Sequence, residues 1–283
     1  MPEDLPDGVA ETAVGAAMMR ARESARADGL FVDPYAAAFV AAVPPIFSDG
    51  PTSRDDPAMA DIEAAFEEVM AVRTRFFDDF VTAAAANGGH QVMLVGAGLD
   101  TRAYRLDWPS GVRLFELDLA AVLNFKNRVL AENAAQLRCE RITVAVDLQR
   151  SDWTTTTLDA GFEPGRPAAW VAEGIVPYLT NDAAERMLLR IGELSSPDSR
   201  LALDHAGGAD DAVLHQARST PTMNDIASMW QGGLLEETSP WLSLHGWDAQ
   251  AVHGESLSAE YGRHESGTTH GLDGVFVTAV RRS

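Results

Sequence analysis

Hydrophobic and polar positions along the chain predict a helical N-terminal part that precedes any strand. Residues 9–28 are rich in alanine and methionine, and Gly29 follows as a helix stop. Asp33 and Pro34 suit the N-cap and the first position of a second helix, and a long helical stretch is expected at about 58–86. The chain is therefore expected to begin with a set of helices.

From residue 91 the pattern changes to short apolar runs that alternate with helical segments. The run that ends at Val95 is typical of a strand buried on both faces. The expected strands are 91–95, 112–118, 142–148, 168–174, 199–205, 246–253 and 274–282. The expected helices between them are 120–134, 181–194 (capped by Thr180 or Asn181) and 256–263. Such alternation predicts an α/β fold with a parallel sheet covered by helices on both faces.

Composition narrows the classes of protein that this chain can represent. With 283 residues, 46% of them hydrophobic, it can form one large domain or two small ones. A net charge of −20 disfavours nucleic acid and anionic membranes as partners. The single cysteine, Cys139, excludes an internal disulfide and favours a reducing cytoplasm. We find no signal peptide and no apolar run of about 18 residues that would span a membrane.

A glycine turn follows the first expected strand, in the sequence V-G-A-G-L-D-T. Gly96 and Gly98 allow the backbone to approach a ligand closely, and ligands of such sheets bind at the carboxyl ends of the strands. Glu116 and Asp118 lie 20 and 22 residues after Gly96, at the end of the next strand. An acid in that place can accept both hydroxyls of a ribose, in a dinucleotide fold or in an adenosyl fold.

The third position of the glycine motif separates these two folds. A dinucleotide fingerprint has a third glycine where this chain has Thr101, and Asp100 puts negative charge where a pyrophosphate would lie. An acid there suits S-adenosylmethionine, which carries a sulfonium and an ammonium group. An NAD(P)-dependent oxidoreductase remains the rival class, although the chain lacks a Tyr-x-x-x-Lys pair because its one lysine is Lys126. A cofactor-binding protein without catalysis is a third alternative.

Four segments carry a resemblance to a known family: LVGAGLDTRAYRL (94–106), FELD (115–118), VDL (146–148) and WVAEGIVPYLT (170–180). They resemble the leucine carboxyl methyltransferase family, and in particular its actinobacterial branch of S-adenosyl-L-methionine-dependent methyltransferases. The resemblance extends over roughly residues 9–282. It implies a class I methyltransferase fold, Rossmann-like, with a mostly parallel seven-stranded sheet whose last strand is antiparallel.

The resemblance also implies roles for individual residues. Gly96, with Gly98 in the same turn, would lie beneath the methionine part of the cofactor, and Asp118 would hold the ribose hydroxyls. Asp147 and Leu148 would flank the adenine. For Asp118 the alternative is an N-cap of the helix that begins at Leu119.

The same resemblance places three charged groups at the methionine end of the cofactor. Glu173 would lie near the amino group, although Glu173 and Asp147 could each merely cap a following helix. Either Arg73 or Arg75 would pair with the carboxylate, and the spacing does not choose between them. Arg20 corresponds loosely to a basic residue of the family's first helix.

The sequence offers fewer indications of the residues that would bind or activate the methyl acceptor. Methyl transfer from a sulfonium is an in-line displacement, in which a carboxylate acceptor needs no general base and a hydroxyl acceptor needs one. His205 at the end of the fifth strand and Tyr178 just after Glu173 are the candidate catalytic residues, with strand-end hydrogen bonding and packing as their alternatives. Nothing around Cys139 indicates an activated thiol. No His/Cys cluster has metal spacing, so we expect no metal.

These elements are expected to form one methyltransferase domain, 1–283, with S-adenosylmethionine as cofactor and a small organic carboxylate or hydroxyl compound as acceptor. Its parts are a helical N-terminal cap (1–88), a cofactor-binding core (89–207), a lid (208–245) and the C-terminal strands of the sheet (246–283). The lid segment lacks clean periodicity, and its methionines and tryptophans could instead complete the core.

Overall fold

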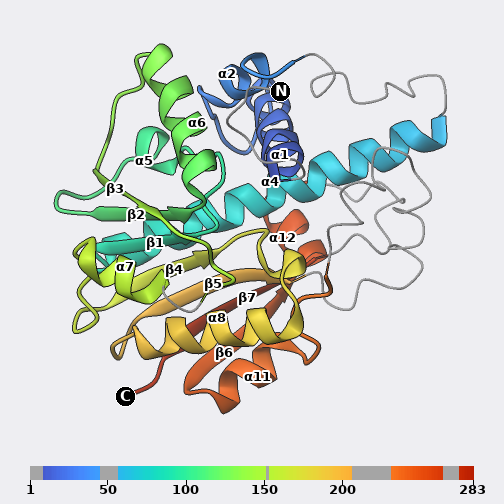
Figure 1. Cartoon of the computed structure of the whole chain (residues 1–283). Coiled ribbons are helices and arrows are strands. Elements are labelled where there is room, and N and C mark those ends of the chain that lie inside the picture. The colour runs from blue at the N-terminus through green and yellow to red at the C-terminus, as the bar shows by residue number, and fades with distance from the viewer. Residues whose placement is uncertain (1–8, 45–56, 151–152, 206–230, 264–273) are drawn as a thin grey trace.

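The computed structural model of the chain describes residues 9–44, 57–150, 153–205, 231–263 and 274–283 (Figure 1). Its centre is a seven-stranded sheet in the order β3-β2-β1-β4-β5-β7-β6. The strands are β1 (Gln91–Val95), β2 (Arg113–Asp118), β3 (Glu140–Ala145), β4 (Ala168–Ala172), β5 (Arg200–His205), β6 (Trp247–His253) and β7 (Val275–Arg281). The strand β7 is antiparallel to both of its neighbours, and the pairs among β1–β5 are parallel. The expected sheet, mostly parallel with an antiparallel last strand, is confirmed.

Helices cover both faces of this sheet, as Figure 1 shows. One face carries α1 (Val9–Ser24), α2 (Ala36–Ala41), α4 (Pro57–Ala86), α5 (Arg102–Arg105), α6 (Ala120–Glu132) and α12 (Gly254–Glu260). The other carries α7 (Trp153–Asp159), the 3₁₀ turn η1 (Val176–Tyr178), α8 (Asn181–Glu193) and α11 (Thr238–Leu244). A separate buried hydrophobic cluster lies on each face. None of the helices in the described ranges is long and apolar enough to cross a membrane.

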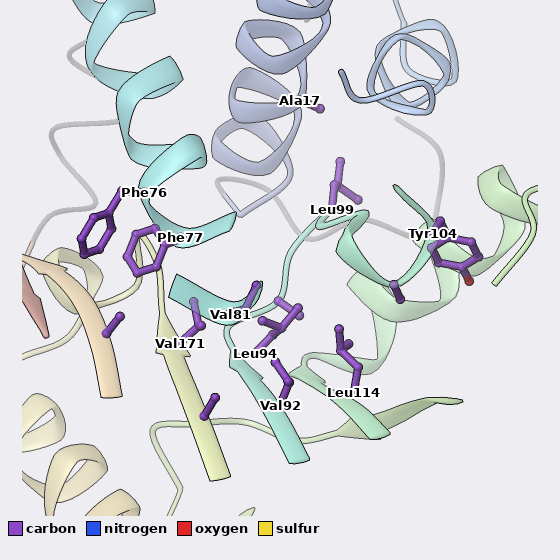
Figure 2. Packing of buried hydrophobic residues seen from close by; sticks show 14 of the residues in the cluster. Ala17, Phe76, Phe77, Val81, Val92, Leu94, Leu99, Tyr104, Leu114 and Val171 are labelled. Atoms are coloured by element: carbon purple, nitrogen blue, oxygen red, sulfur yellow. The ribbon is translucent and has the colours of Figure 1, made fainter. Parts of the chain in front are cut away.

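The helix α4 is the element that joins the N-terminal helices to the sheet. Figure 2 shows Phe77 and Val81 of α4 close to Leu94 of β1 and Val171 of β4, and all four side chains are buried. Because these residues recur at helical spacing, one stripe of α4 faces the sheet along its second half. That contact fixes which way the neighbouring polar residues of α4 point.

Several boundaries differ from those expected, for identifiable reasons. The third strand begins at Glu140 rather than at 142, because its pairing with β2 starts where Glu140 lies opposite Arg113. It ends at Ala145, so Asp147 and Leu148 follow the strand instead of closing it. The second helix starts at Ala36, because Asp33 accepts the amides of Tyr35 and Ala36 and so caps a preceding turn. Thr180 is confirmed as the cap of α8.

Part of the segment 208–245 can be located. Residues 208–230, including Met223, Met229 and Trp230, lie outside the described residues. The remainder packs onto the molecule: the amide of Gly233 donates to Leu179 O at 3.0 Å, and Trp241 of α11 is 4% exposed. Residues 231–245 therefore contribute to the core cluster beside α8.

An ion-pair cluster in the interior connects β2, β3 and α6. The chain's only lysine, Lys126, places its Nζ 2.8 Å from Glu116 Oε2, and both side chains are 0% exposed. Arg141 Nη2 lies 2.6 Å from the same oxygen. Burial lowers the pKa of Lys126, while Glu116 opposes that shift. Glu116 is therefore committed to two cations inside the fold.

Replacing Glu116 by Ala should destabilise the protein by roughly 3–5 kcal/mol, because two cations would lose their buried partner. The double variant Glu116→Leu/Lys126→Met should recover much of that loss, since it removes the fully buried charge together with its partner. Urea unfolding followed by circular dichroism measures both, and Glu132→Ala in an exposed pair with Arg128 is the control. A loss below about 1 kcal/mol for Glu116→Ala would contradict the assignment.

Candidate cofactor-binding and active site

The glycine turn after β1 is held against the end of β2. The amides of Gly96 and Ala97 both donate to Leu117 O, at 2.9 and 3.0 Å. Gly96 has φ +72° and Gly98 has φ +45°, which are left-handed conformations that favour glycine. A Cβ on Gly96 would lie 3.1–3.2 Å from the side chain of Ile175. The turn thus keeps a bare backbone surface at the carboxyl edge of the sheet.

Asp118 points toward this turn from the end of β2. Its Oδ2 accepts the amide of Gly98 at 2.6 Å, and its Oδ1 accepts the amide of Leu119 at 2.7 Å. Asp118 is 9% exposed as a residue. Burial raises the pKa of its carboxyl, and the two amides partly oppose that shift. The helix α6 has Leu119 as its cap residue, without a side-chain cap. The alternative of Asp118 as an N-cap is therefore wrong.

Arg73, from the middle of α4, meets Glu173 and Asp204 at the carboxyl ends of β4 and β5. Arg73 Nε donates to Glu173 Oε1 at 3.1 Å, and its Nη1 lies 3.5 Å from Asp204 Oδ2. Burial would lower the pKa of Arg73, but Asp204 and Glu173 raise it overall. Gly174, with φ +64°, packs against the guanidinium, because a Cβ there would lie 3.2 Å from Arg73 Nη1.

Arg75 occupies a different environment from Arg73. Its Nε bonds both oxygens of Asp79, at 2.9 and 3.0 Å, and its Nη1 donates to Leu30 O at 3.1 Å. Its guanidinium also lies 5.6 Å from the ring centroid of Tyr261. Of the two arginines left open by the sequence, the structure brings Arg73 to Glu173.

Arg102 of α5 binds the turn, α4 and β4 together. Its Nε donates to Asp78 Oδ1 at 2.7 Å, its Nη1 to Glu173 Oε2 at 2.8 Å, and its Nη2 to Thr74 O at 3.3 Å. Nη1 also bonds the carboxylate of Asp100. The side chain is 2% exposed, and these acids hold its pKa well above the ordinary value in spite of burial. Glu173 therefore lies between two arginines.

The acid at the turn, Asp100, is strongly held in its charged form. Its Oδ1 accepts the amide of Arg102 at 2.7 Å. Burial alone would raise its pKa, but Arg102, Lys126 and Arg105 lower it to about 2. Arg20 of α1 also contacts this turn, because its Nη2 donates to Leu99 O at 2.7 Å while its Nε donates to Asp33 at 2.9 Å. Arg20, which corresponds loosely to a basic residue of the family's first helix, therefore lies beside the glycine turn.

The remaining expected residues are less constrained. Asp147 is exposed and accepts the amide of Gln149 at 3.0 Å, and Leu148 is half-buried against the second core cluster. Tyr178 is half-buried in η1, close enough for its phenol to influence Arg73. His205 ends β5, and its side chain lies outside the described part.

The sequence did not predict roles for Arg102, Asp78 and Asp204. Asp204 could have been predicted, because it lies next to the last residue of the fifth strand, much as Asp118 is the last residue of the second. Arg102 lies inside the quoted D-T-R motif, but its partners are 24 and 71 residues away along the chain, so no spacing rule pairs them.

Within the described ranges, the structure shows neither an activated cysteine nor a cluster of metal ligands. Burial raises the pKa of the half-buried Cys139 thiol to about 12. It is therefore a neutral thiol at physiological pH, as the sequence indicated. No group of three or more His, Cys, Asp or Glu in this part of the chain is placed to hold a metal ion.

The sheet order, the glycine turn and the acids at the strand ends define a class I methyltransferase. A model of the leucine carboxyl methyltransferase family matches residues 13–192. Relatives named "Putative S-adenosyl-L-methionine-dependent methyltransferase" occur in Frankia alni, at 45% identity over 99% of this chain and 96% of that one, and in Streptomyces coelicolor, at 42% over 98% and 97%. The chain belongs to the leucine carboxyl methyltransferase family and is an S-adenosylmethionine-dependent methyltransferase, so the oxidoreductase alternative falls away.

Solved structures share the fold at low sequence identity. A DUF574 family protein from Streptomyces avermitilis has a TM-score of 0.58 at 18% identity, over 94% of this chain and 97% of that one. A protein described as a "putative methyltransferase" from Thermobifida fusca has a TM-score of 0.54 at 16% identity, over 80% and 88%.

Asp100→Asn should cost about 2 kcal/mol of unfolding free energy at pH 7, because the folded pKa of about 2 lies below the ordinary 3.8. A lowered pKa stabilises the fold above the unfolded value, so the difference from wild type should shrink as the pH falls from about 5 toward 2. Urea titrations at pH 7 and pH 3 measure this. Asp107→Asn, in an exposed pair with Arg138, should show neither effect, and a pH-independent loss for Asp100→Asn would contradict the interpretation.

Proposed function

We propose that this methyltransferase transfers the methyl group to oxygen, of a carboxylate or a hydroxyl, on a small organic molecule. The observation that carries the proposal is membership of a family named for carboxyl methylation. The net charge of −20 disfavours a large polyanionic acceptor. A single carboxylate remains compatible with it, because one positive group in the pocket offsets a field that salt screens over about 10 Å.

For the cofactor, we assign the ribose to Asp118 and the turn of Gly96 and Gly98 to the methionine part beside it. The geometry fits, because the turn is bare backbone where Ile175 crowds any Cβ, and Asp118 is fixed by two amides. Asp147 and Leu148, just after the end of the neighbouring strand β3, are assigned to the adenine. An exposed carboxylate beside a half-buried leucine suits an amine and an aromatic face.

At the methionine end we assign Glu173 to the ammonium group and Arg73 to the carboxylate. Their ion pair at 3.1 Å supports the choice of Arg73, since Arg75 is engaged with Asp79. Arg102 donates a hydrogen bond to the other oxygen of Glu173, so this carboxylate is already oriented in the absence of a ligand. Such preorganisation reduces the ordering that binding has to supply.

The bound cofactor supplies an already activated methyl group, so the chain's residues mainly position the reactants and exclude water. Glu173 and Asp204 are both paired with Arg73. A carboxylate acceptor needs no base. For a hydroxyl acceptor, Tyr178 and His205 are the candidates.

The acceptor pocket is proposed to form between the N-terminal cap (1–88) and the segment 208–245, within one domain. Arg20 supports this arrangement, because it ties α1 to the glycine turn through Leu99 O. The cap therefore adjoins the end of the sheet where the cofactor is assigned.

Asp118→Ala should weaken S-adenosylmethionine binding at least about tenfold, because each charge-assisted hydrogen bond is worth roughly 1.5–3 kcal/mol. Titration calorimetry measures this. Asp118→Asn, which keeps an oxygen for the Gly98 amide, separates loss of charge from loss of the turn. Asp248→Ala on the exposed edge strand β6 is the control. Wild-type affinity in Asp118→Ala would refute the ribose assignment.

The acceptor atom is tested with cofactor carrying a radiolabelled methyl group and a panel of small carboxylates, phenols and amines. Oxygen methylation is expected. Brief treatment with alkali should release the label as methanol if the product is a methyl ester, whereas a methyl ether should retain it. Labelled amines, or no labelled product with any acceptor class, would oppose the proposal.

A further inference from the structure

The ion pairs at the assigned methionine site join more carboxylates than guanidinium groups. Within the described residues, three guanidinium groups share a connected set of ion pairs with four carboxylates: Arg73, Arg102 and Arg105 with Asp78, Asp100, Glu173 and Asp204. The cluster therefore carries one negative charge in excess when all its members are ionised.

Asp204 is the carboxylate of this cluster that is held least closely by its cation. Its Oδ1 accepts the amide of Gly174 at 2.6 Å, a task that a neutral oxygen could perform. Its Oδ2 lies 3.5 Å from Arg73 Nη1, but Arg73 already has Glu173 as a closer partner at 3.1 Å. Burial raises the pKa of Asp204, and Arg73 opposes that shift only in part, so the ionised form is costly in this position. A buried carboxylate that is only loosely paired suits a ligand that brings positive charge.

The reaction distinguishes two forms of the cofactor by charge. S-adenosylmethionine carries a sulfonium, and S-adenosylhomocysteine carries a neutral thioether after the methyl group has left. The carboxylate and the ammonium group are the same in both. Arg73 and Glu173 therefore cannot separate substrate cofactor from product by pairing with those groups alone.

We propose that Asp204 is a specificity-determining residue that makes the site prefer the positively charged sulfonium form over the thioether product. Its side chain is 14% exposed at the carboxyl end of β5, so its field reaches the ligand side of the cluster with little screening by water. This inference rests on the proposed assignment of Arg73 and Glu173. Its consequence is weaker inhibition by the product and easier release after transfer.

The test compares Asp204→Asn with wild type by titration calorimetry with S-adenosylmethionine and S-adenosylhomocysteine. Asn keeps an oxygen for Gly174 and removes the charge. S-adenosylmethionine should bind about tenfold more weakly, and S-adenosylhomocysteine equally well or better, because Arg73 loses a competing carboxylate. In turnover, the inhibition constant of S-adenosylhomocysteine should fall relative to the KM of S-adenosylmethionine. Equal loss for both ligands would assign Asp204 a merely structural role and overturn the proposal.

Glu173→Gln separates failure of this inference from failure of the site assignment. If Glu173 holds the shared ammonium group, Glu173→Gln weakens both ligands, while Asp204→Asn changes only their ratio. Unchanged binding of both ligands to Glu173→Gln would refute the assignment itself, and the inference with it.

A measurement on the wild-type protein does not depend on how any variant folds. Sinefungin has a carbon that bears an ammonium group in place of the sulfur that bears the methyl group, so it has the positive charge without a transferable methyl group. It should bind wild type more tightly than S-adenosylhomocysteine, by about the factor that separates S-adenosylmethionine from it. Equal binding of sinefungin and S-adenosylhomocysteine would overturn the proposal.

Discussion

The buried guanidinium of Arg102 is the contact on which the geometry of this site depends. Burying such a group is costly unless every direction of its hydrogen bonding is used. Here it reaches α4 through Asp78 and Thr74 O, the glycine turn through Asp100, and β4 through Glu173. Three elements distant in sequence are thereby held at one point. The acid assigned to the cofactor is oriented by the same interaction that completes the fold.

The long helix α4 contributes to both the core and the site, because its apolar residues contact the sheet and its arginine Arg73 contacts acids of the site. Phe77 and Val81 pack onto the sheet (Figure 2). Arg73, one turn earlier, pairs with Glu173 at the end of β4. The N-terminal helices are therefore more than an addition to a complete sheet. They supply the positive charge that the acidic strand ends lack.

Local signals predicted the parts of the molecule that depend on local physics. Apolar runs predicted the positions of the strands. The glycine turn and Asp118 predicted that the candidate site lies at the carboxyl edge of the sheet. The choice between Arg73 and Arg75 required knowing which face of α4 packs, because residues two apart point to nearly opposite sides of a helix. Arg102 and Asp204 were missed because their roles arise from partners brought together only by the fold. The short helices α7 and α11 have too few turns to show a period.

The position of β7 has a consequence for how the chain reaches its native state. The sheet order places β7 between β5 and β6, so β6, although synthesised earlier, has no neighbour in the sheet until β7 inserts. Until β7 is in place, the backbone groups of β6, including those of Trp247, lack their partner strand. A strand with unpaired backbone groups can pair with the wrong partner. At this edge of the sheet, β7 must therefore pair with β5 before β6 can join the sheet, although β6 precedes β7 in the sequence.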